Sequence, residues 1–402
     1  MRIYNPSSEE ALRARQLLKE WAGDGLLTQD QYRHLQQETT SDLRTTNIFL
    51  RLVLFLFTLI CIGALGGLFY KVFIDGISDQ PLGIFLLIYA GVCYAAAEAA
   101  VSQARLYRHG IEEALAVCSV GCLCLGMQLA FFSQWTALGG QDRVPSLVPA
   151  AGALFSLWIW HRFRLWYAFP AAMIFALFVP DYWTSSHVAQ HVIVALCYAI
   201  GLICVIAVRA RQARDYMEHD YSLAEAFLWV GIYLDINLQL SWSQLRMQMW
   251  GATRAGTEFA SWFYWTTWVL IWALPPVMLA RGVRQRDRFV IAAGTISAVL
   301  TFVTNKPYLG WARHTWDPML LGILLIGIAL LLRRWLARGP TGIRHGFTAA
   351  TLSGKDKQWM NAGSTVLGLV TPQAITPSPQ ATETDFRFGG GASGGGGAGG
   401  DF

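Results

Sequence analysis

Long apolar runs, separated by short charged or turn-rich breaks, fill the chain from about residue 48 to residue 336. Each run has about 18 to 23 residues, and an α-helix rises about 1.5 Å per residue, so each can cross a hydrocarbon core about 30 Å thick. The pattern predicts an all-α, polytopic membrane protein with about ten transmembrane helices. The expected spans are 48–70, 82–102, 111–132, 144–161, 165–183, 187–208, 223–241, 259–280, 288–305 and 317–336.

Polar segments flank the apolar region at both ends. Near the N-terminus, Gly23-Asp24-Gly25 separates two amphipathic stretches, and Thr28 followed by Gln31 has the spacing of a capping box. Near the C-terminus, proline and then glycine dominate, which is typical of a disordered tail. The expected parts are a cytoplasmic helical hairpin at 1–46, the transmembrane domain at 47–338, a cytoplasmic polar segment and linker at 339–384, and a Gly-rich tail at 385–402.

The distribution of Lys and Arg predicts the orientation, because basic residues concentrate in the cytoplasmic connections of inner-membrane proteins. The clusters Arg209–Arg214 and Arg281–Arg288 fall in alternate connections, on the same side as the N-terminus, and the opposite connections hold fewer basic residues. Ten spans across a bacterial cytoplasmic (inner) membrane, with both termini in the cytoplasm, fit this alternation. The first apolar run begins near Ile48, after a long charged segment, so we expect no cleaved signal peptide.

Composition agrees with this interpretation. Hydrophobic residues make up 54% of the chain and charged residues 14%, whereas soluble domains carry about 25% charged residues. The formal net charge is +5, but the basic residues stand at the ends of apolar runs rather than on one solvated face. We therefore expect the lipid bilayer as a partner and no nucleic acid.

Polar residues inside the apolar runs are the candidates for chemistry, since burying them in a membrane is costly. They are Glu98, Gln128, Asp235 and Asn237. These side chains can line a hydrated pathway, or they can form a buried hydrogen-bonded network that locks helices together. Glu98 is expected to pair with an arginine such as Arg51.

Metal and cofactor signals are sparse. His187 and His191 have the i, i+4 spacing of zinc ligands, but Val188 stands where the H-E-x-x-H motif has its glutamate, so they are a weak candidate site. All seven cysteines lie inside apolar runs, where they act as small hydrophobic residues. The chain shows no nucleotide or hydrolase motif, and we predict no cofactor and no catalytic residue.

Both polar ends carry residues suited to docking other proteins. In the hairpin these are Trp21 and Leu27, and in the tail they are Phe386, Phe388 and Phe402, which flank the glycine tract. Such elements point to other envelope proteins as partners.

The segment from Leu18 to Gln31, LKEWAGDGLLTQDQ, followed by many apolar runs, resembles the bacterial membrane proteins of the family called domain of unknown function 2157. The match covers roughly the first seventy residues in sequence and the remainder by architecture. The resemblance implies an inner-membrane protein and supplies neither an activity nor site residues.

Three function classes follow. The first is a membrane-embedded scaffold or accessory subunit of an envelope complex, with the hairpin and tail as docking elements. The alternative is a transporter or channel for a small solute, with Asp235, Asn237 and Glu98 near the path. The second alternative is an intramembrane enzyme.

Overall fold

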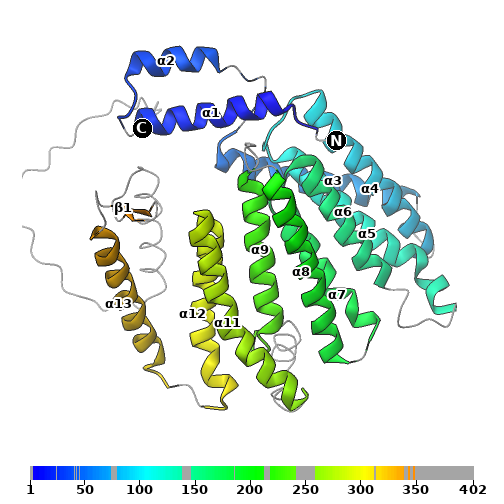
Figure 1. Cartoon of the computed structure of the whole chain (residues 1–402). Coiled ribbons are helices and arrows are strands. Elements are labelled where there is room, and N and C mark those ends of the chain that lie inside the picture. The colour runs from blue at the N-terminus through cyan, green and yellow to red at the C-terminus, as the bar shows by residue number, and fades with distance from the viewer. Residues whose placement is uncertain are drawn as a thin grey trace, which may run out of the picture. The chain divides into compact units, whose positions relative to one another are not determined.

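In the computed structural model the chain is almost entirely helical (Figure 1). The structure describes residues 3–348 except 24, 40, 42, 45, 74–78, 138–145, 185, 212–217, 241–258, 312–313, 339–342 and 345–346. The elements are α1 (Pro6–Gly23), α2 (Gln29–Glu38), α3 (Ile48–Phe73), α4 (Asp79–Ser102), α5 (Ile111–Ala137), α6 (Leu147–Phe163), α7 (Ala168–Phe178), the 3₁₀ helix η2 (Pro180–Tyr182), α8 (His187–Arg211), α9 (Glu218–Ile236), α11 (Ser261–Gln285), α12 (Arg288–Tyr308), α13 (Asp317–Ala337) and the paired strands β1 (Ile343–Arg344) and β2 (Phe347–Thr348). All belong to one compact unit, Met1–Ala350; the second unit is Thr351–Phe402.

In the part of the chain that the structure describes, seven helices are long and apolar enough to cross a membrane, namely α3, α4, α5, α8, α11, α12 and α13. Their surfaces carry many exposed leucine, isoleucine, valine and phenylalanine side chains, as expected where lipid rather than water is the solvent. The prediction of an all-α, multi-pass membrane protein is confirmed at this level.

The other three predicted spans form helices that differ from the seven in length or charge. Helix α6 has 17 residues, and α7 has 11 before η2 continues it. Helix α9 has 19 residues, but four of them are acidic. The three pack among the longer helices: α6 on α5 and α7, and α9 on α8, α12 and α11.

Two boundaries differ from the prediction for local reasons. Helix α7 ends at Phe178 instead of reaching 183 because Pro180 follows, and a proline has no N–H to donate to the carbonyl oxygen four residues before it, that of Ala176. Helix α9 ends at Ile236 instead of 241. There the Asn237 side-chain oxygen accepts a hydrogen bond from the backbone N–H of Gln239 at 3.3 Å, a local bond that competes with the helix.

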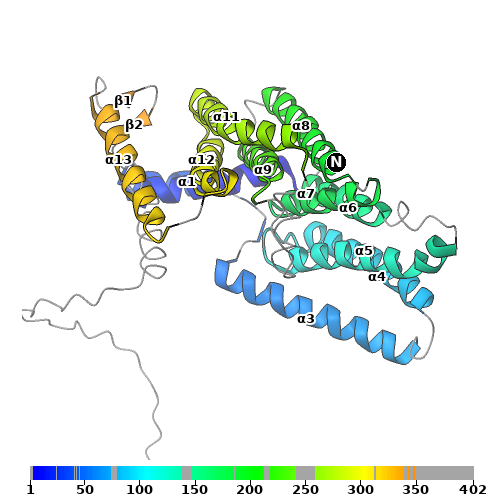
Figure 2. The same ribbon diagram turned by 90° about the horizontal axis from the view of Figure 1, so that it is seen from below.

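The helices follow one another in a packed series that Figure 2 shows from below. Helix α3 lies on α5, α5 on α4 and α6, α6 on α7, α8 on α9, and α9 on α12, which pairs with α11. The tightest approach joins α4 and α5 at Gly83, where an added Cβ would stand 2.1 Å from the backbone nitrogen of Ala130. Only glycine permits this close approach of two helix backbones.

The N-terminal hairpin is held by its first helix. The sequence-predicted capping box at Thr28 and Gln31 is confirmed at the start of α2. Before α1, Tyr4 is buried in a cluster with Phe163 and Ala97, and Arg13 on α1 forms an ion pair with Asp220 at 3.7 Å. Helix α2 has no buried residue. The hairpin segment therefore docks through Tyr4 and α1 on α4, α6 and α9 and leaves α2 exposed.

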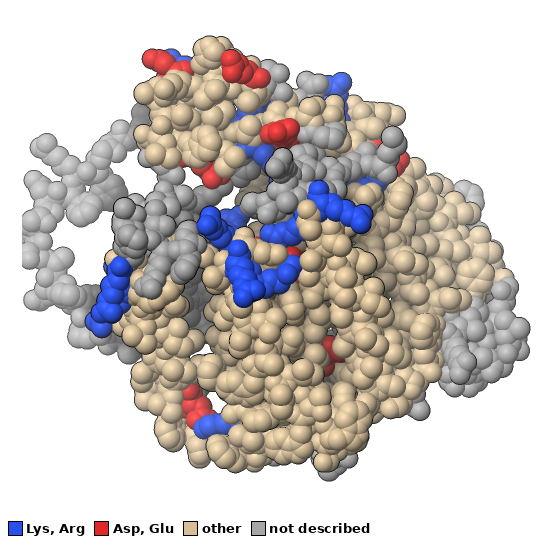
Figure 3. All heavy atoms as spheres, in the orientation of Figure 1, with Lys and Arg blue, Asp and Glu red and all other residues tan. Residues whose placement is uncertain are grey.

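Alternate connections meet at opposite ends of the helices. At one end, hydrogen bonds and ion pairs join Ile3 to Arg162, Arg44 to Tyr107, Arg13 to Asp220, and Arg209 to Asp287. At the other end they join Ser146 to Trp183, Tyr264 to Tyr308, and Lys306 to Asp317. On the face in Figure 3, basic side chains gather over the helix ends nearest α1, and most of the surface beyond them is uncharged.

Candidate functional site

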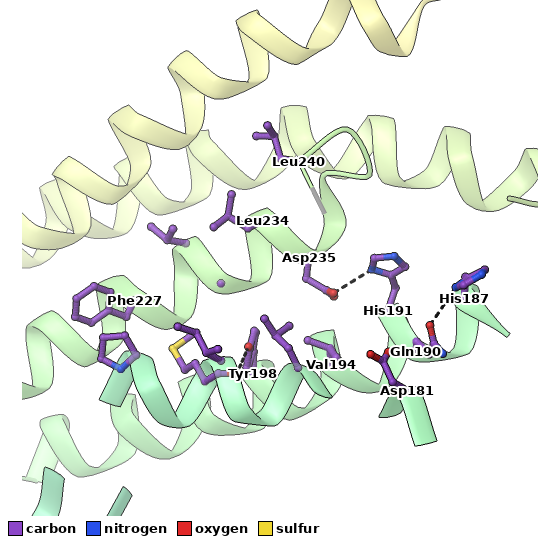
Figure 4. Close-up of a pocket in the computed structure, with 16 residues that line it drawn as sticks. Asp181, His187, Gln190, His191, Val194, Tyr198, Phe227, Leu234, Asp235 and Leu240 are labelled. Carbon is purple, nitrogen blue, oxygen red and sulfur yellow. Dashed lines mark hydrogen bonds and ion pairs between the residues drawn. The ribbon is translucent and has the colours of Figure 1, made fainter. Parts of the chain in front are cut away.

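A cavity of about 510 Å³ lies between α7, α8 and α9 (Figure 4). Its polar groups gather at one end, and its apolar groups line the remainder. The polar lining residues are Asp181, His187, Gln190, His191 and Asp235. The apolar lining includes Pro170, Met173, Ile174, Leu177, Val194, Tyr198, Phe227, Val230, Gly231, Leu234 and Leu240. A long apolar groove with a polar head is the shape that an amphiphilic molecule requires.

Asp235 and His191 form the centre of the polar end. His191 Nδ1 lies 3.0 Å from Asp235 Oδ1, in a hydrogen bond between α8 and α9. Asp235 is only 7% exposed, and its second oxygen, Oδ2, is buried without a hydrogen-bond partner among the described residues. A buried carboxylate oxygen without a partner is costly, and this cost is removed when a donor reaches it.

His187 stands one turn before His191 and also lines the cavity. Its Nδ1 is 3.2 Å from the side-chain oxygen of Gln190, whose amide nitrogen donates to the backbone oxygen of Thr184 at 2.7 Å. The two histidines thus have different partners. Among the described residues, no group of three or more His, Cys, Asp or Glu side chains is arranged to hold a metal ion.

Helix α7 forms one wall of the groove, and it contacts both α8 and α9. Tyr198 on α8 donates a hydrogen bond to the backbone oxygen of Met173 at 2.7 Å, which fixes α7 against α8. On α9, Gly231 leaves room for the Met173 side chain, since a Cβ there would stand 2.3 Å from Met173 Cε. Ile174 and Leu234 line the cavity and are 56% and 37% exposed, so the groove opens sideways, toward the lipid.

Glu98 lies elsewhere, at the end of the helices nearest α1. Its Oε1 accepts hydrogen bonds from Arg162 Nε at 2.7 Å and from the Tyr94 hydroxyl at 3.0 Å. The expected pairing of Glu98 with Arg51 is wrong: Arg51 forms its ion pair with Glu113 instead. The backbone of Arg51 itself makes the tight contact with Gly110, where an added Cβ would stand 2.2 Å from the Arg51 carbonyl oxygen, and this contact places Arg51 beside the start of α5.

Asn237 belongs to a third environment, a buried network between α9 and α12. Its side-chain nitrogen donates to the Tyr233 hydroxyl and to Thr304 Oγ1, both at 3.0 Å. The Tyr233 hydroxyl also lies 2.9 Å from Thr301 Oγ1. These groups satisfy one another, so this network matches the helix-locking alternative from the sequence.

Gln128 is half-buried on α5. The structure therefore does not bring Glu98, Gln128, Asp235 and Asn237 together: of the four, only Asp235 is among the residues that line the cavity. The candidate docking residues lie apart as well. Trp21 lies in the last turn of α1 and is 44% exposed, and Leu27 follows in the turn before α2. Phe386, Phe388 and Phe402 lie outside the described residues.

Sequence reasoning gave little weight to an ion-pair network at the end nearest α1. Glu225 is fully buried and accepts hydrogen bonds from Arg209 at 2.9 Å and from Arg281 at 2.5 Å. Arg209 also pairs with Asp287 at 2.6 Å, and Ser222 donates to the same carboxylate. Burial alone would raise the pKa of Asp287, but the Ser222 hydrogen bond and the charge of Arg209 hold it below its usual value. Glu225 interrupts an apolar run and Arg209 directly follows one, and these are the signals that could have found them.

Comparison of the chain with models of protein families, with curated proteins and with solved structures found no match. The resemblance of residues 18–31 to domain of unknown function 2157 stays a prediction. The functional argument therefore rests on the chain's own geometry.

Proposed function

We propose that this protein is an integral inner-membrane protein that binds an amphiphilic small molecule in the groove between α7, α8 and α9. One observation carries the proposal: a buried carboxylate oxygen of Asp235, without a hydrogen-bond partner among the described residues, at the polar end of an apolar groove that opens toward the lipid. This develops the transporter alternative from the sequence, with Asp235 at the site and Glu98 and Asn237 in structural roles.

We further propose ten membrane crossings, with α6, α7 and α9 added to the seven long apolar helices, and both termini in the cytoplasm. The contacts at the two helix ends support this count. The connections whose basic residues predict a cytoplasmic location contact one another and the N-terminal segment at one end of the helices. The connections predicted to be periplasmic contact one another at the other end. If one of the helices from α3 to α12 did not cross, the later connections would lie at the wrong end.

Reporter fusions test the crossings. A reporter that is active only in the periplasm should be active when fused after residue 250, between α9 and α11, and silent when fused after residue 285, at the end of α11. The reverse pattern would refute the proposed orientation.

Photolabelling tests the binding site. The purified full-length protein, in phosphatidylcholine nanodiscs, is photolysed with a dodecanol that carries a diazirine on its chain, and labelled peptides are mapped by mass spectrometry. We expect label on α7 and α9, at residues near Ile174 and Leu234. Leu234→Trp should remove this label because the larger ring fills the groove. Leu196→Trp, at an exposed α8 position that does not line it, should not. Label spread evenly over all lipid-facing helices would refute the proposal.

A second function, the scaffold or accessory subunit, is favoured by the exposed hairpin. Helix α2 has no buried residue, and Leu17, Trp21 and Leu26 present apolar side chains beside it. Affinity purification of the full chain and of variants without residues 1–45 or 385–402 should yield different partners. The same partners from all three would refute this role.

A further inference from the structure

The polar end of the groove is rich in acceptors. Two of its residues are acidic, Asp181 and Asp235, and the described lining contains no lysine or arginine. An ionised carboxylate only accepts hydrogen bonds, and its charge attracts cations. From this excess of acidic over basic side chains we infer that the molecule held in the groove is a cationic amphiphile, an inference that rests on the proposed function. Its ammonium headgroup would lie against Asp235, and its apolar chain would lie along α7 and α9.

The two carboxylate oxygens of Asp235 have different roles in the proposed site. His191 occupies Oδ1 at 3.0 Å, so it fixes the orientation of the carboxylate and leaves Oδ2 for a ligand. An ammonium group brings up to three N–H donors and a full positive charge. In a site of low dielectric, a charge-assisted hydrogen bond of this kind is stronger than a bond to a neutral donor.

Other headgroups fit less well. A carboxylate or phosphate would face Asp181 and Asp235 without a basic residue from the described lining to balance it. A neutral alcohol could donate to Asp235 Oδ2, but it would leave the buried negative charge uncompensated.

The apolar part of the groove sets the length of the chain. From His187 at the polar end to Tyr198, the lining follows twelve residues of α8, and their eleven steps of about 1.5 Å span on the order of 16 Å in all. An extended dodecyl chain is of comparable length. Figure 4 shows Phe227 at the end opposite to His187, so the chain would run from the histidines toward Phe227.

Calorimetric titration at pH 8 tests the headgroup. The full-length protein in phosphatidylcholine nanodiscs is titrated with dodecylammonium, dodecyltrimethylammonium, dodecanol and dodecanoate, and binding is corrected for partition into empty nanodiscs. We expect dodecylammonium to bind at least about ten-fold more tightly than dodecanol, with dodecanoate weakest. Dodecyltrimethylammonium, which keeps the charge and lacks N–H donors, should fall between dodecylammonium and dodecanol.

Variants separate the inference from the proposed function. Asp235→Asn should remove the preference for dodecylammonium over dodecanol, and Asp181→Asn, at an exposed position, should reduce it. Glu98→Gln, outside the groove, should leave it unchanged. If dodecanol or dodecanoate binds as tightly as dodecylammonium, yet Leu234→Trp blocks them all, the cationic headgroup is refuted and the binding site stands. If none of the four binds, or if Leu234→Trp changes nothing, the proposed function itself fails.

Discussion

Replacing Glu225 by glutamine should destabilise the protein far more than the same change at Glu98. Both carboxylates pair with arginine near the same end of the helices. Glu225 is fully buried between Arg209 and Arg281, whereas the Glu98 side chain is 34% exposed and its partner Arg162 is 20% exposed. The two positions therefore differ mainly in burial.

The size of each destabilisation depends on whether the replacement leaves an arginine charge buried without a partner. Removing one partner of a buried ion pair costs about 3–5 kcal/mol, because the other charge stays buried. Arg209 keeps Asp287 at 2.6 Å, and the Arg281 side chain is 26% exposed, so water can reach it. For Glu225→Gln we therefore expect a loss in the free energy of unfolding at the lower limit of this range, about 3 kcal/mol. This corresponds to a change on the order of 100-fold in the unfolding equilibrium constant. For Glu98→Gln we expect about 1 kcal/mol or less.

Reversible unfolding in mixed micelles of dodecylmaltoside and SDS measures both values. Tryptophan fluorescence reports the transition, since the chain has 17 tryptophans. A double replacement, Glu225→Gln with Arg281→Gln, should recover part of the loss because it removes the stranded charge. Equal destabilisation by Glu225→Gln and Glu98→Gln would refute the argument that burial decides the strength of these pairs.

Three further predictions use the same unfolding assay. Gly83→Ala should cost about 1–3 kcal/mol, because its Cβ meets the backbone of α5, whereas Gly91→Ala, with no atom within 4 Å of the added Cβ, should be neutral or slightly stabilising. The lowered pKa of Asp287 contributes stability that is present above about pH 4 and is lost as the pH falls through the folded-state value. The difference in the free energy of unfolding between wild type and Asp287→Asn should therefore decrease as the pH is lowered. A difference that does not depend on pH would contradict this. Asn237→Leu should cost about 1–3 kcal/mol by leaving Tyr233 and Thr304 with fewer partners, while dodecylammonium binding stays intact; lost binding in a folded variant would place Asn237 in the site.

The sequence predicted the helices better than their ends. Apolar length alone identifies the seven long helices, because in a membrane every buried backbone group must be satisfied within its own helix. The ends depend on single residues that average hydropathy ignores. Pro180 stops α7 early, and the side chain of Asn237 stops α9. Helix α7 forms one wall of the groove, so this small error in the prediction falls at the main feature of the molecule.

The site itself was predicted in fragments. Asp235 was recognised as a costly polar residue, and His191 as half of a weak zinc pattern, but nothing in the sequence joined them. Their bond links α8 to α9 across 44 positions of the chain, and helix pairing at that range depends on three-dimensional packing. Glu98, Gln128 and Asn237 had the same hydropathy signal as Asp235. Only their partners distinguish a structural role from a site.

That distinction can be stated in terms of charge. Glu98, Glu113, Glu225 and Asp287, all near the end close to α1, each pair with an arginine, which stays charged under all ordinary conditions. Asp235 alone among these five carboxylates has a histidine partner, and one of its oxygens has no partner in the described chain. An arginine there would have produced a permanent internal pair and closed the site to a cation. Histidine holds the carboxylate in position without neutralising it permanently, which is the arrangement that a reversible binding site for a cation requires.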